Sequence, residues 1–182
     1  MLITLEIAKE SSIGNKILNS NIDLLSPKHC FLSILLLQEK INPISKWKHY
    51  LEILPKLYIN FPVFYKAEEM KELEGSPFLD QIKQKTMDIR SDYDSIIKAI
   101  PEFNKFTFEE FMEMRMVVSS RIFGIKVAGR KTDCLAPLAD MLNHKRPRQT
   151  QWYFSDDIKS FVIKATQDIE SDEQVVIIYL DL

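Results

Sequence analysis

The spacing of apolar residues divides the chain into an opening strand, a helical block and a strand-rich end. Apolar and polar residues alternate over residues 1–7, which is typical of a β-strand. From Ser26 to about Ile122 the apolar residues recur at the intervals of amphipathic helices. Strand-like runs follow after Gly124, and they span residues 151–155, 160–165 and 174–179.

Capping signals predict where the main helices begin. Ser26-Pro27 and Ser76-Pro77 each combine a preferred N-cap residue with a proline in the first turn. The run after Ser76 keeps its helical spacing until Pro101. Thr107 and Glu110 have the spacing of a capping box, in which each side chain accepts a backbone N–H of the other residue. We therefore expect long helices after Ser26, Ser76 and Thr107.

Composition and charge narrow the function classes. The chain has 182 residues, 46% of them hydrophobic, and 24 basic against 26 acidic side chains give a net charge of −2. This balance gives no electrostatic reason to expect nucleic acid or an anionic membrane as a partner. No apolar run is long enough to span a bilayer, and no secretory signal opens the chain. We expect an intracellular protein, cytoplasmic or nuclear, whose oligomeric state the sequence leaves open.

The cysteines and glycines exclude two kinds of site. Cys30 and Cys134 lie far apart and form no metal-ligand pattern, so buried, reduced thiols and no metal are expected. The four glycines lack the spacing of a phosphate-binding loop.

Three polar positions remain as candidates for chemistry. Arg121 lies near a helix C-terminus, where a cation is favourable in any case. Asn143-His144 lies in a polar turn, and Tyr179 closes an apolar strand. Each position alone is better explained as structural than as catalytic.

The order of these positions changes that interpretation. The segments S-S-R-I-F at 119–123, L-A-P-L-A-D-M-L-N-H at 135–144 and V-V-I-I-Y at 175–179 resemble the C-terminal half of SET-domain methyltransferases. The resemblance is to the branch of Rubisco large-subunit lysine methyltransferase and actin-histidine methyltransferase. Upstream, W-x-x-Y-x-x-x-L-P-x-x-Y at 47–58 is similar to a segment of the same branch. Several motifs in one order make this signal specific.

The resemblance implies an α+β fold, with small SET-type β-sheets, a pseudoknot and a helical insertion that splits them. Residues 1–25 are then the remnant of the N-terminal SET strands, residues 26–115 the insertion, and residues 116–182 the C-terminal SET segment. The chain opens after the family's glycine-containing cofactor turn, and it stops soon after Tyr179. Lys145 stands where the family usually has a small hydroxyl residue. We therefore expect the fold to be incomplete at both ends, and the isolated chain to bind cofactor weakly or not at all.

The resemblance also implies an activity, the S-adenosyl-L-methionine-dependent N-methylation of lysine in a protein substrate. Arg121, Asn143 and His144 would bind the cofactor, and Tyr179 would be the catalytic residue beside the sulfonium. Asp140 and Phe123 would contact the substrate. Lysine is favoured because lysine-specific relatives carry Phe two residues after the Arg, whereas the histidine-specific relative carries Asn.

Two other functions stay open. The chain could be a non-catalytic SET-like module whose helical block presents an interaction surface, or it could be a protein-histidine methyltransferase. Phe123 could equally be a core residue with no role in substrate choice.

Overall fold

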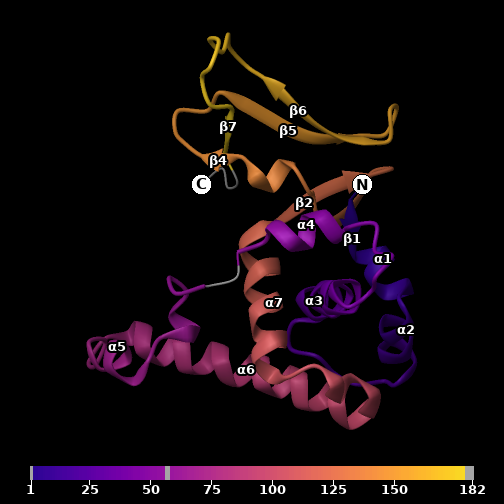
Figure 1. The fold of residues 1–182 in the computed structure, drawn as a ribbon, viewed down its shortest axis with the longest axis vertical. Helices are drawn as coiled ribbons and strands as arrows, with labels where there is room; N and C mark the ends of the chain where they lie inside the picture. Colours follow the sequence, from indigo (N-terminus) through magenta and orange to yellow (C-terminus); the bar gives the residue numbers. More distant parts are fainter. Residues whose placement is uncertain (1, 56–57, 179–182) are drawn as a thin grey trace. The chain divides into compact units, whose positions relative to one another are not determined.

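The computed structural model describes residues 2–55 and 58–178, which belong to two compact units. One unit consists of residues 1–5 and 121–182, and the other of residues 6–120 (Figure 1). The first contains the strands and the second most of the helices, so the α+β class expected from the sequence is confirmed. Residues 6–25 belong to the same unit as the helical block. The division of the chain into residues 1–25, 26–115 and 116–182, which was made from the sequence, stays an interpretation.

The helical unit is built around one buried helix. The apolar run of residues 30–37 lies in α3 (Pro27–Lys40) and is buried along its whole length. A helix that is apolar on all sides must be covered by others. The remaining elements of the helical block are α1 (Leu5–Glu10), α2 (Ser12–Asn19), α4 (Lys48–Ile53), η1 (Pro62–Phe64), α5 (Ala67–Lys71), α6 (Pro77–Ala99), η2 (Pro101–Lys105) and α7 (Phe108–Arg121).

The capping signals identify the helix starts correctly. The hydroxyl of Ser76 accepts the backbone N–H of Phe78 at 3.2 Å where α6 begins. At the start of α7, Glu110 N–H donates to the Thr107 hydroxyl at 3.2 Å and Thr107 N–H donates to the Glu110 carboxylate at 2.9 Å. Both bonds of the predicted capping box are therefore present. At Ser26 only the helix start is as predicted, because its side chain makes no capping bond.

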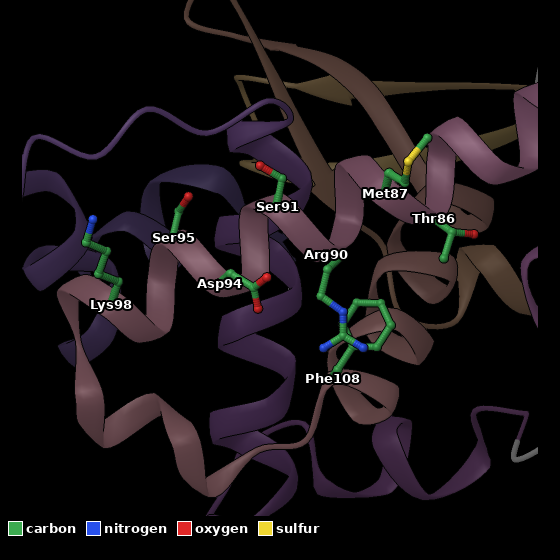
Figure 2. A pocket seen from close by; sticks show the side chains of 8 residues that line it. All are labelled: Thr86, Met87, Arg90, Ser91, Asp94, Ser95, Lys98 and Phe108. Carbon is green, nitrogen blue, oxygen red and sulfur yellow. The ribbon is translucent and has the colours of Figure 1, made fainter.

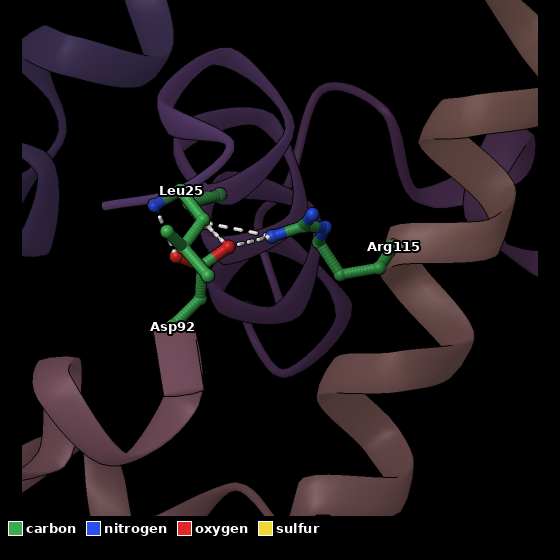
Figure 3. Close-up of polar contacts among 4 residues, drawn as sticks. Leu25, Asp92 and Arg115 are labelled. Atoms are coloured by element: carbon green, nitrogen blue, oxygen red, sulfur yellow. Dashed lines mark hydrogen bonds and ion pairs between the residues drawn. The ribbon is translucent and has the colours of Figure 1, made fainter. Parts of the chain in front are cut away.

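A buried ion pair joins the helices of this unit (Figure 3). Arg115 on α7 donates from Nη1 to the carboxylate of Asp92 on α6 at 2.8 Å, and both side chains are 1% exposed. Asp92 also accepts the backbone N–H of Leu25 at 2.7 Å and the thiol of Cys30 at 3.2 Å. Burial raises the pKa of the Cys30 thiol, which therefore stays protonated and can donate. Cys30 is thus a buried thiol, as expected.

The described residues of the strand unit form three small sheets. β1 (Ile3–Thr4), β3 (Arg130–Leu135) and β2 (Ile122–Val127) form an antiparallel sheet in that order. β5 (Thr150–Ser155) and β6 (Ser160–Ala165) form a hairpin, and β4 (Asn143–His144) pairs in parallel with β7 (Val176–Ile177). A short η3 turn (Ala139–Met141) precedes β4. The predicted strands at 151–155 and 160–165 are confirmed.

Three parts of this unit differ from the sequence-based expectation, and the first is the run at 174–179, of which only Val176–Ile177 forms a strand among the described residues. The β2–β3 hairpin lies in a stretch for which the sequence predicts no strand, and it turns at Ala128 and Gly129, whose φ angles of 48° and 76° suit a tight hairpin turn. The opening strand is confined to Ile3–Thr4, because only these residues pair with β3 and α1 begins at Leu5.

Two further observations concern the helical block. Its surface has an open hollow of about 600 Å³ along α6, where the Arg90 guanidinium lies over the Phe108 ring, 3.3 Å from its centroid (Figure 2). None of the site residues predicted from the sequence lines this hollow. Within residues 2–55 and 58–178, every helix is too short or too polar to cross a membrane.

Candidate functional site

The candidate site begins with an ion pair between two of the predicted residues. Arg121 ends α7, and Asp140 lies in the η3 turn. Nη1 of Arg121 donates to the backbone carbonyl of Asp140 at 3.2 Å and to its carboxylate Oδ2 at 3.3 Å. The Asp140 side chain is fully buried, whereas that of Arg121 is 19% exposed. In this ion pair the carboxylate is therefore buried, and the guanidinium is partly exposed to solvent.

Asn143 and His144 form strand β4, beside the last described strand of the chain. Asn143 is the partner of Val176 and His144 of Ile177 in a parallel pair. The pairing continues for one bond, from Lys145 N–H to the carbonyl of Ile177 at 3.3 Å. The side chains of Asn143 and His144 are exposed. Segments more than thirty residues apart in the sequence thus meet at the Asn-His pair.

Strand β7 is also held by side chains of β5. The Thr150 hydroxyl donates to the carbonyl of Val176 at 2.8 Å, and the indole N–H of Trp152 donates to the carbonyl of Ile178 at 3.0 Å. Val176 and Ile177 are buried. The backbone is therefore fixed up to Ile178. Tyr179, the predicted catalytic residue, lies outside the described residues, so its position beside the Asn-His pair stays a prediction.

Phe123 is a core residue of the strand unit. It is 1% exposed and lies edge-on to Trp152 and Phe161, with both ring centroids 5.1 Å from its own. Ile125, Cys134 and Ile177 belong to the same cluster. This packing agrees with the interpretation of Phe123 as a core residue. Its predicted contact with substrate stays a prediction.

Replacing Phe123 with asparagine should destabilise the protein before it changes any acceptor preference. The substitution removes a buried ring and leaves an amide in an apolar cluster, so we expect the free energy of unfolding to fall by about 4 kcal/mol. Phe123→Leu is the matched control, and it should lose less because it stays apolar. Urea denaturation measures both variants. An asparagine variant as stable as the leucine variant would contradict the core role of Phe123.

The turn that carries Asp140 is strained. Leu138 has a φ of 79° although it has a branched side chain, and that side chain is 82% exposed. Backbone bonds from Asp140 N–H to Ala136 and from Leu142 N–H to Ala139, at 3.1 and 3.2 Å, hold the turn. Such conformations persist only where the surroundings enforce them, and they concentrate at functional sites.

A hydrogen bond connects the loop after the Asn-His pair to the acidic turn before β7. The Gln149 amide donates to the Glu173 carboxylate at 2.6 Å. This bond, together with one from the Glu170 N–H, holds the pKa of Glu173 below its usual value. The contact therefore connects the segment that follows β4 to the segment that precedes β7.

Among the described residues, no group of three or more His, Cys, Asp or Glu side chains is placed to hold a metal ion.

The structure therefore brings some of the predicted residues together. Arg121 and Asp140 are in contact, and the turn containing Asp140 leads directly into Asn143-His144. Sequence reasoning did not predict the Arg121–Asp140 bond, although the two residues lie in adjacent motifs. It also missed the supporting bonds of Thr150 and Trp152, because no sequence signal marks a side chain that donates to a distant carbonyl.

Comparison with known proteins agrees with the resemblance seen in the motifs. No protein-family model matches the chain. Among curated proteins, it is 29% identical over 190 residues to actin-histidine N-methyltransferase of Danio rerio, and 28% identical to that of Homo sapiens. Each alignment covers 98% of this chain but only 31% and 32% of the relative. The chain thus spans about a third of the length of these relatives.

Solved structures show the same fold. The SET domain of LSMT bound to lysine and AdoHcy matches with a TM-score of 0.77 at 21% identity, over 98% of this chain and 42% of that one. Rubisco LSMT bound to AdoMet also matches with a TM-score of 0.77, at 24% identity, over 98% and 41% of the two chains. The resemblance to a SET-type methyltransferase of this branch is confirmed.

Proposed function

We propose that this chain, which has the SET-domain fold, forms part of a protein N-methyltransferase that uses S-adenosyl-L-methionine. The observation that carries the proposal is the parallel pair of β4 and β7, which places the exposed Asn143-His144 beside the strand leading to Tyr179. The contact between Arg121 and the turn before Asn143 adds a cation to the same segment. The alignments cover about a third of the curated relatives, and their activity is carried over as part of the proposal.

The chain's polar residues suit the parts of the cofactor. The guanidinium of Arg121 binds the carboxylate of the methionine moiety, because its N–H groups match a carboxylate in geometry and charge. Asn143 and His144 donate and accept hydrogen bonds to the amino acid and adenosine parts. The cofactor supplies a methyl group already activated by the sulfonium, so the protein mainly binds and aligns the reactants.

Tyr179 orients the acceptor nitrogen in this proposal. It directly follows Ile178, whose carbonyl is held by Trp152 at 3.0 Å. The phenol oxygen accepts a hydrogen bond from the neutral amine and orients the nitrogen lone pair, which only the neutral form has, towards the methyl group.

The acceptor is a side-chain nitrogen of a protein, and two kinds are candidates. Phe123 favours lysine, because of the resemblance to lysine-specific relatives at this position. The relatives whose names specify histidine favour histidine instead. Since Phe123 is 1% exposed, its ring gives little support to either choice.

A methyl-transfer assay on the full-length gene product tests the proposal. Labelled S-adenosyl-L-methionine is supplied with protein extract, and mass spectrometry identifies the modified side chain as lysine or histidine. We expect Tyr179→Phe to lower the rate by roughly 100-fold, because the phenol oxygen is lost at the reacting nitrogen. Tyr153→Phe is the matched control, since Tyr153 is 45% exposed on β5. No transfer by the native protein, or equal rates for both variants, would overturn the proposal.

A non-catalytic interaction module is the alternative function. The helical unit, whose surface carries the hollow along α6, would then present the binding surface. The cofactor measurement described in the Discussion separates the two functions, because an interaction module has no need of a cofactor.

A further inference from the structure

Asp140 has a contact pattern that suits a role beyond direct substrate binding. Its side chain is fully buried, and both its carbonyl and its carboxylate accept from the same nitrogen, Nη1 of Arg121. A buried carboxylate next to a partly exposed guanidinium favours one orientation of the arginine. A rotation of Arg121 would break both of these contacts with Asp140.

The contact also decides which edge of the guanidinium remains available. A guanidinium can bind a carboxylate bidentately through two of its nitrogens. With Nη1 donating to Asp140, the edge formed by Nε and Nη2 remains, and these atoms have no hydrogen-bond acceptor among residues 2–55 and 58–178. The Arg121 side chain is 19% exposed, so a ligand can approach it.

We infer that Asp140 is a positioning residue, which orients Arg121 so that its Nε–Nη2 edge receives the carboxylate of the cofactor. The inference rests on the proposed function and adds a residue to its binding site. Asp140 also affects the position of the Asn-His pair, because the turn that contains Asp140 leads into Asn143. The strained turn at Leu138 and the Arg121 bond to the Asp140 carbonyl keep this segment in one conformation. Asp140 therefore couples the arginine to the Asn-His pair.

Two ligands distinguish positioning from a general structural role. S-adenosylhomocysteine has the amino acid carboxylate, whereas 5′-methylthioadenosine has the same nucleoside without it. The Asp140→Asn variant removes the charge that orients Arg121 but keeps the size of the side chain. We expect its Kd for S-adenosylhomocysteine to rise about tenfold and its Kd for 5′-methylthioadenosine to stay within about twofold, because one charge-assisted contact is weakened. Calorimetric titration of the gene-encoded polypeptide measures both constants.

Controls separate the outcomes. Asp157→Asn makes the same chemical change in the exposed turn between β5 and β6, and it should leave both constants unchanged. If Asp140→Asn does not fold, Asp140→Glu replaces it, since glutamate keeps the charge but its longer side chain moves the carboxylate relative to Nη1 of Arg121. It should show the same selective loss. Equal losses for both ligands, or no loss, would overturn the inference and leave the proposed function intact. No binding of S-adenosylhomocysteine by the native protein would overturn both.

Discussion

Replacing Arg115 with methionine is expected to lower the free energy of unfolding by about 3–5 kcal/mol. The substitution leaves the carboxylate of Asp92 buried without its cation, although Leu25 N–H still donates to it at 2.7 Å. The reverse variant, Asp92→Leu, leaves the guanidinium of Arg115 buried without its anion. Nε and Nη2 of Arg115 have no hydrogen-bond partner among the described residues, and Nη1 donates to the Cys30 sulfur as well as to Asp92, so the carboxylate of Asp92 supplies the negative charge beside this cation.

The double variant Arg115→Met with Asp92→Leu provides the control. Replacing both charged groups with apolar side chains removes the unpaired charge and restores apolar contact. We therefore expect the double variant to be more stable than either single variant. Urea denaturation of the four proteins gives the coupling energy, which should exceed about 2 kcal/mol. Additive effects of the two substitutions would show that the ion pair does not hold the helices as described.

Replacing Arg121 with methionine should weaken the binding of S-adenosylhomocysteine by roughly 10- to 100-fold. The loss corresponds to a hydrogen bond between charged groups, which contributes about 1.5–3 kcal/mol. Arg130→Met is the matched control, because Arg130 is exposed at the start of β3. Calorimetric titration measures both variants. An unchanged Kd for Arg121→Met would remove the arginine from the proposed cofactor site.

Much of the helical unit could be predicted from local signals. The capping box at Thr107 and the cap at Ser76 depend on neighbouring residues, so the sequence contains what is needed to predict them. The buried run of α3 was equally visible as an apolar stretch. The Asp92–Arg115 pair could not be predicted, because it joins two helices through a contact between residues 23 positions apart.

The strand unit was harder to predict from local patterns. The β5–β6 hairpin could be predicted from two strand-like runs of residues, whereas no strand was predicted for the residues of the β2–β3 hairpin. The meeting of Asn143-His144 with β7 was implied by family resemblance alone. A two-residue parallel pair between segments more than thirty residues apart leaves no periodic signal in the sequence.

The measurement that tests the cofactor site most directly is a map of backbone amide NMR shifts as S-adenosylhomocysteine is added to the gene-encoded polypeptide. Our account predicts that the largest shift changes fall at Arg121, in the segment 140–145 and in β7 (Val176–Ile177). Saturable changes confined to these places would support the site. Binding with the largest changes elsewhere, or no binding at all, would contradict it.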